Sequence, residues 1–108
     1  MRYVPEEMLG IAKVTRETRY DEKGIVYGHP SVVEVDLIVK DKEHILVEVK
    51  SRISRGDVAE IYRIGKLYEE VHGINPKLPI IGGFIDSRAW NTARKLEVEL
   101  KPAFIAEL

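Results

Sequence analysis

Cysteine is absent from the 108-residue chain, and so is glutamine. Without cysteine the protein has no disulfide, no thiolate ligand for zinc and no cysteine nucleophile. Asparagine occurs only at Asn75 and Asn91, whereas charged residues make up 32% of the chain. A composition with few thermolabile residues, such as asparagine, glutamine and cysteine, and many charged residues is typical of thermophile proteins.

Long apolar runs are also missing. None approaches the roughly 18–20 residues of a membrane span, and the first ten residues lack the apolar core of a signal peptide. We therefore expect a cytoplasmic protein without membrane contact. The net charge of −1 does not indicate a nucleic-acid partner, although such a sum can hide a one-sided basic patch. With 44% hydrophobic residues, we expect one folded domain over residues 1–108.

The apolar patterns predict the element order α-β-β-β-α-β-α-β. Strands are expected at 11–20, at 25–40 with an interruption at Gly28-His29-Pro30, and at 44–50, 78–85 and 103–106. Helices are expected at 5–10, 54–72 and 88–97. Because the third strand reaches a parallel fourth strand through a helix, we expect a mixed sheet of the α/β or α+β class, with helices against both faces.

The longest predicted helix has clear boundaries. Ser54 or Asp57 can cap its start, and Gly73 can end it. Its apolar residues recur at helical spacing and should face the core. They are Ile61, Ile64, Tyr68 and Val71.

The second and third strands form the most informative segment, VEVDLIVKDKEHILVEVK, because charged residues interrupt two apolar strands. Alternation gives each strand one wholly apolar face and one mixed face. If both apolar faces lie on the same side of the sheet, the loop must have an odd number of residues, such as Asp41 to Glu43. A two-residue loop at Lys42-Glu43 would instead pair Asp36 with Val49.

The odd loop brings charges together. Asp36 would lie opposite Glu48, with Cβ atoms about 4.5–5.5 Å apart, and Glu34 would lie opposite Lys50. Directly opposed carboxylates repel, and a divalent cation removes that repulsion. Mg²⁺ or Mn²⁺ suits such oxygen ligands, and a nearby lysine can act on an attacking water or on developing phosphoryl charge. The alternative is a salt-bridge ladder on a solvated face, with Glu34 paired to Lys50 and Asp36 to Lys40.

The motif Val35-Asp36-Leu37-Ile38, followed by Glu48-Val49-Lys50-Ser51, resembles the signature of the PD-(D/E)xK nuclease superfamily. The version here is similar to archaeal Holliday-junction resolvases and small bacterial nuclease-like proteins. The longer segment from Tyr20 to Val58 also resembles an uncharacterised archaeal family of this superfamily. The resemblance covers roughly Lys13 to Ile105.

The resemblance implies a restriction-endonuclease-like fold and specific site residues. Asp36 and Glu48, helped by the backbone carbonyl of Val49, would bind the metal. Lys50 would be the catalytic lysine, and Glu34 an accessory carboxylate. Many members carry a further acidic residue on a first helix. Here only Glu6 or Glu7 could serve, so the domain could lack a longer N-terminal helix.

Four basic residues after the motif are candidates for phosphate contacts: Arg52, Arg55, Arg63 and Lys66. They could equally be solvated charges on a helix face. The leading hypothesis is a homodimeric DNA endonuclease that uses Mg²⁺ or Mn²⁺ and a metal-activated water. By resemblance, its substrate would be double-stranded or branched DNA. The alternative is a catalytically inactive module of the same fold, serving protein assembly or DNA binding.

Overall fold

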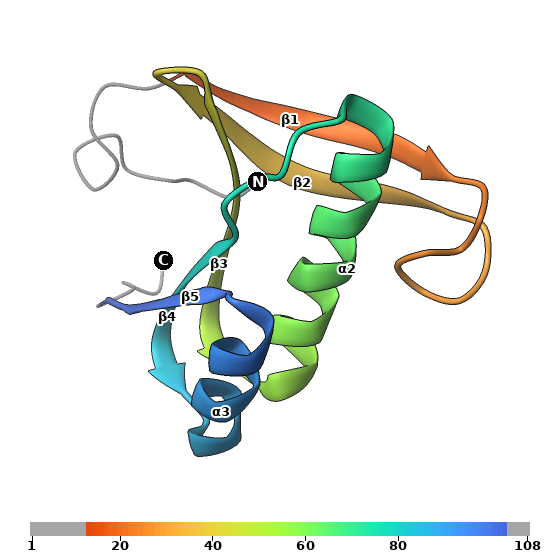
Figure 1. Cartoon of the computed structure of the whole chain (residues 1–108). Coiled ribbons are helices and arrows are strands. Elements are labelled where there is room, and N and C mark those ends of the chain that lie inside the picture. Colours follow the sequence, from red (N-terminus) through yellow and green to blue (C-terminus); the bar gives the residue numbers. More distant parts are fainter. Residues whose placement is uncertain (1–12, 104–108) are drawn as a thin grey trace.

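The computed structural model describes residues 13–103, which form a mixed five-stranded sheet and two helices (Figure 1). The elements are β1 (Lys13–Asp21), β2 (Ser31–Lys40), β3 (Glu43–Ile53), α2 (Arg55–His72), β4 (Pro79–Ile85), α3 (Ser87–Leu96) and β5 (Glu99–Pro102). The sheet order is β1-β2-β3-β4-β5. β1, β2 and β3 pair antiparallel, whereas β3, β4 and β5 pair parallel. The expected mixed sheet is thus confirmed, and the helix expected at 5–10 lies outside the described residues.

The boundaries of α2 follow from local hydrogen bonds. The Ser54 hydroxyl accepts from the backbone N–H of Asp57, and the Asp57 carboxylate accepts from the backbone N–H of Ser54. This reciprocal pair is a capping box. At the other end Gly73 adopts φ 68° and its N–H donates to the carbonyl of Glu69. Both predicted ends of the helix are confirmed.

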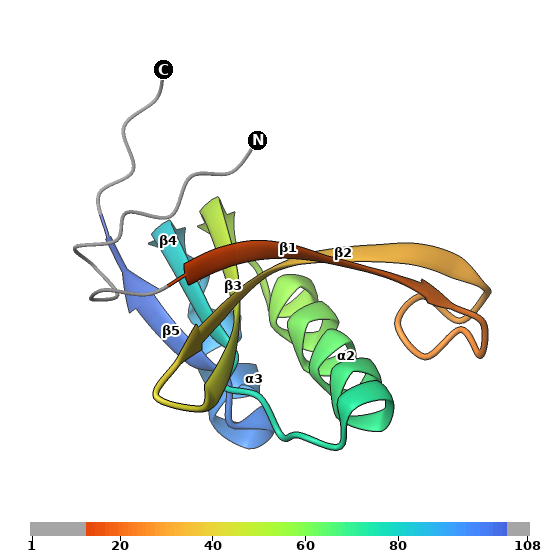
Figure 2. The same cartoon turned by 90° about the horizontal axis from the view of Figure 1, so that it is seen from above.

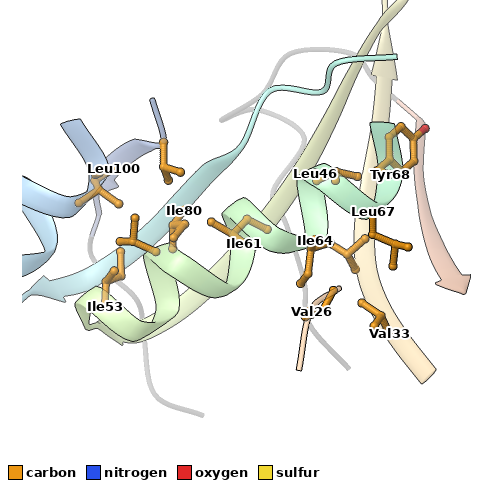
Figure 3. Packing of buried hydrophobic residues seen from close by; sticks show 14 of the residues in the cluster. Val26, Val33, Leu46, Ile53, Ile61, Ile64, Leu67, Tyr68, Ile80 and Leu100 are labelled. Atoms are coloured by element: carbon orange, nitrogen blue, oxygen red, sulfur yellow. The ribbon is translucent and has the colours of Figure 1, made fainter. Parts of the chain in front are cut away.

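Both described helices pack on the same face of the sheet, so the expectation of helices on both faces is not met within residues 13–103 (Figure 2). Ile61, Ile64 and Leu67 of α2 point toward strand and loop residues in the main core (Figure 3). Tyr68 is buried there too, as predicted. Val71 is 41% exposed, because it lines a shallow hollow beside β1 instead of entering the core.

The opposite face of the sheet is also apolar. Ile38, Val47 and Ile81 are buried together there, with Ile45 and Val49 against them. β2 and β3 therefore carry apolar side chains on both faces, a fact that bears directly on their register.

The second predicted strand starts later than expected. Residues 25–27 form a turn, because the buried Asp21 carboxylate accepts from the backbone N–H groups of Ile25 and Val26. The last strand within residues 13–103 is Glu99–Pro102, and residues 104–106 of the predicted 103–106 strand lie outside the described residues. As an edge strand, β5 tolerates a terminal proline, which has no N–H to pair.

Candidate active site

The hairpin between β2 and β3 closes with a two-residue turn at Asp41-Lys42. Both residues have positive φ, 52° and 67°, the conformation of a type I′ hairpin turn. The resulting ladder places Asp36 opposite Val47. The predicted three-residue loop, and with it the pairing of Asp36 with Glu48, is therefore wrong.

The register prediction failed because it assumed a single buried face. Val33 and Val35 pack toward the helices, whereas Val47 packs with Ile38 and Ile81 on the opposite face. Burial specifies a register strongly where only one face of the strands is covered. Here both registers bury apolar side chains, so the geometry of the turn decides.

The observed register places Asp36 and the Glu48-Val49-Lys50 part of the motif on different faces of the sheet. Asp36 shares a face with Val47, so Glu48 and Lys50 alternate to the opposite face, and the three side chains do not point to one side. The paired ladder ends, however, at Asp36. Beyond that pair the β1–β2 hairpin swings away from β3 (Figures 1 and 2). Glu34 and Glu48 lie in this diverging part and line the same hollow.

Arg16 of β1 joins the carboxylates at this divergence. Its guanidinium lies 3.0 Å from Glu34 Oε2 and 3.3 Å from Asp36 Oδ1. The hydrogen bond to Glu34, with the further negative charges of Asp36 and Glu48, raises the pKa of Arg16 above its ordinary value. Three carboxylates of the candidate site therefore act on one cation. The alternative ladder from Glu34 to Lys50 is not formed, because Lys50 bonds elsewhere.

Asp36 is the most enclosed of these carboxylates. Its residue is 5% exposed, and Oδ2 is buried without a hydrogen-bond partner among the described residues. Glu48 is 8% exposed. Charged groups are rarely buried to this extent unless they are paired or bind an ion. The sequence contained this feature only indirectly, as charges within apolar strands.

The hollow contains two residues that the sequence analysis missed. Glu60 of α2 and Tyr27 of the β1–β2 loop line it together with Glu34 and Glu48. Burial, together with the negative charges of Glu60 and Glu48, raises the pKa of the Tyr27 hydroxyl. The sequence offered one signal for Glu60. Because α2 follows β3 directly and packs against the sheet, the first turns of α2 lie near the strand that carries Glu48.

Lys50 lies on the helix side of β3. Its Nζ donates to Asp57 Oδ1 at 2.8 Å, and this hydrogen bond raises the pKa of Lys50 despite partial burial. Burial pushes the pKa of Asp57 upward, but the hydrogen bonds from Lys50 and Ser54 outweigh it and leave the pKa below its usual value. At neutral pH the pair is an ammonium and a carboxylate.

Two of the predicted phosphate-binding residues lie just after the motif. Arg52 is exposed, with its guanidinium 5.1 Å from the centre of the Phe84 ring and 3.9 Å from Asp86 Oδ2. Arg55 is exposed in the first turn of α2. Both remain accessible to a charged ligand.

The other two basic residues occupy different surroundings. The Arg63 side chain donates to the backbone carbonyl of Val26 at 2.6 Å, so it holds the β1–β2 loop against α2. Lys66 lines a separate hollow with Tyr62 and Lys77. The structure therefore does not gather the four predicted residues on one surface.

The domain has the restriction-endonuclease-like fold. Its sheet is mixed, and the central β2–β3 hairpin carries carboxylates and a lysine at the point where the two strands separate. The family model of the PD-(D/E)XK nuclease superfamily matches residues 31–99, more than half of the chain, and the chain belongs to this superfamily. The resemblance based on the Asp36 and Glu48 motif is thereby confirmed. A second model, for a family of proteins of unknown function (DUF3782), matches residues 1–30.

A solved structure of EndoMS in apo form shares the fold, with a TM-score of 0.65 and 14% sequence identity. The match covers 99% of this chain but 49% of that chain, so this protein spans about half the length of EndoMS. No curated protein matches the sequence significantly. Neither α2 nor α3, the helices within residues 13–103, has the apolar length needed to cross a membrane.

Proposed function

We propose that this protein is a metal-dependent DNA endonuclease that hydrolyses phosphodiester bonds. The observation that carries the proposal is that Arg16 bonds Glu34 and Asp36 and lines a hollow that Glu48 also lines, with Lys50 two residues after Glu48. Membership of a nuclease superfamily supports this chemistry. DNA, double-stranded or branched, is the proposed substrate.

PD-(D/E)XK nucleases generally use divalent metal ions, and the donor chemistry here fits one. The buried, unpartnered Oδ2 of Asp36 is a hard oxygen that a cation would satisfy. Asp36, Glu48 and the Val49 carbonyl would hold Mg²⁺ or Mn²⁺. Within residues 13–103, no three acidic or histidine side chains form a ready-made metal-binding group. The proposal therefore requires the carboxylates to draw together when an ion binds.

A bound divalent ion would supply the Lewis acidity that makes water a nucleophile near neutral pH. The protein's own side chains have separate tasks. The Lys50 ammonium neutralises charge that develops on the phosphoryl oxygens. Glu34 orients the Arg16 guanidinium beside Asp36. Arg52 and Arg55 bind flanking phosphates without reading sequence.

We propose further that the chain forms one cytoplasmic domain that acts as a homodimer. A duplex has two strands to cut, and a domain of 108 residues carries one candidate set of Asp36, Glu48 and Lys50. A second copy would supply a second set. Sedimentation with and without DNA measures this directly.

The test is cleavage of plasmid and branched DNA with Mg²⁺ or Mn²⁺, comparing wild type with Asp36→Asn and Lys50→Ala. Lys66→Ala is the matched control, because it removes the same charge from a separate hollow. We expect wild type and Lys66→Ala to cut and both site variants to fail. Isothermal titration with Mn²⁺ should show binding to Lys50→Ala but not to Asp36→Asn. Lys50→Ala cutting at the wild-type rate would refute the assignment.

The second candidate is an inactive nuclease-fold module for DNA binding or protein assembly. Arg16 favours it, because its guanidinium already supplies positive charge between Glu34 and Asp36. In that case wild-type protein would neither bind Mn²⁺ nor cut DNA.

A further inference from the structure

We infer that Asp57 is a positioning residue that holds the Lys50 ammonium in place for phosphodiester hydrolysis. The inference rests on the proposed function and adds a residue outside the PD-(D/E)XK motif. Its basis is the ion pair between Lys50 Nζ and Asp57 Oδ1 at 2.8 Å, between the end of β3 and the start of α2.

The Asp57 carboxylate divides its two oxygens between two tasks. Oδ2 accepts from the backbone N–H of Ser54 at 2.8 Å and from the Ser54 hydroxyl at 2.9 Å. Oδ1 accepts from Lys50. Capping the helix requires only one acceptor oxygen, so the bond to Lys50 is additional to the cap.

The cap makes Asp57 a rigid support. Its side chain is short, its backbone is fixed at the third position of an 18-residue helix, and Ser54 restrains its carboxylate from two directions. The positive end of the helix dipole stabilises a negative charge there. The carboxylate is therefore held independently of Lys50.

Lys50, by contrast, is a flexible four-carbon chain that would otherwise sample many rotamers. One ammonium N–H is directed to Asp57, which leaves two donors for phosphoryl oxygens. Holding a catalytic group in position matters for the rate, since a misplacement of about 1 Å can cost on the order of 100-fold. Asp57 thus acts through Lys50 and need not touch the substrate.

The experiment measures kcat and KM for DNA cleavage by Asp57→Asn, which keeps the size of the side chain and one oxygen for the cap. We expect kcat to fall by at least about 10-fold, with KM and Mn²⁺ affinity within about 3-fold of wild type. Asp57→Glu, which restores the charge, should recover part of kcat.

Ser54→Ala separates capping from positioning. It removes a cap hydroxyl but leaves the Ser54 backbone N–H and the Lys50 contact to Asp57. It should lower the melting temperature and reduce kcat clearly less than Asp57→Asn does, because the backbone N–H of Ser54 still holds Oδ2 of Asp57. Equal loss of kcat in Ser54→Ala and Asp57→Asn would overturn the inference in favour of a merely structural role.

The outcomes separate the role of Asp57 from the proposed nuclease activity. If wild type cuts DNA and Asp57→Asn cuts equally well, only the role of Asp57 is refuted. If wild type does not cut, the proposed function fails and the inference falls with it. NMR of the Lys50 side chain gives a further readout, because its Nζ should become more mobile in Asp57→Asn and remain restrained in Ser54→Ala.

Discussion

Asp36→Asn tests whether the enclosed carboxylate is strained in the absence of an ion. Asp36 is 5% exposed, and its Oδ2 has no hydrogen-bond partner among the described residues. Leaving a buried polar group unsatisfied costs about 1–3 kcal/mol, and more when the group is charged. Asparagine has the same shape but no charge, so it should relieve part of this cost.

The opposing term is the ion pair with Arg16. The distance is 3.3 Å, and the Arg16 side chain is about half exposed, so solvent screens the pair and its loss is small. Asparagine also keeps an oxygen that can accept from Arg16. We therefore expect the free energy of unfolding in EDTA to stay the same or rise by up to about 1 kcal/mol. For a domain of this size, 1 kcal/mol corresponds to roughly 4–8 °C in melting temperature.

The assay is thermal unfolding of wild type and Asp36→Asn in EDTA and then across a Mn²⁺ titration. Wild type should gain stability as Mn²⁺ is added, since an ion that binds the folded state stabilises it, and Asp36→Asn should not. Glu34→Gln is a useful comparison, because Glu34 bonds the same guanidinium from an exposed position. Loss of more than about 2 kcal/mol by Asp36→Asn in EDTA would refute the reasoning and identify Asp36 as a structural ion-pair residue.

Three further predictions concern the framework around the site. Arg63→Met removes the donor to the Val26 carbonyl and should lower the free energy of unfolding by about 1–3 kcal/mol, measured by urea denaturation. Gly82→Ala would place a Cβ 2.5 Å from Cδ1 of Ile53, so overpacking should cost about 1–3 kcal/mol in the same assay, and an unchanged midpoint would contradict that packing. Folding lowers the pKa of Asp57 from its ordinary 3.8. The ionised carboxylate therefore contributes fully to folding stability above pH 3.8, and this contribution is lost as the pH falls through the lower pKa of the folded state. Acid titration of stability should show this loss in wild type but not in Asp57→Asn.

The sequence by itself determined most of the fold, because the decisive signals are local. The reciprocal bonds of Ser54 and Asp57 span three residues, and Gly73 supplies the left-handed conformation that ends α2. Periodicity identified three buried residues of the long helix, Ile61, Ile64 and Tyr68. It missed the buried Val58 and Leu67, and it wrongly included Val71, which is 41% exposed. The Asp36 and Glu48 motif also indicated the superfamily correctly.

Tertiary structure alone decided how the candidate site is assembled. A turn with two positive φ values chose the register, which burial left open because both faces of the sheet are apolar. Arg16 meets Asp36 from 20 residues away, and Glu60 reaches the hollow because α2 crosses back over β3. Such contacts join segments that have no periodic or hydrogen-bonding relation along the chain. Their positions follow from the divergence of β2 and β3, which depends on how the whole sheet twists and packs.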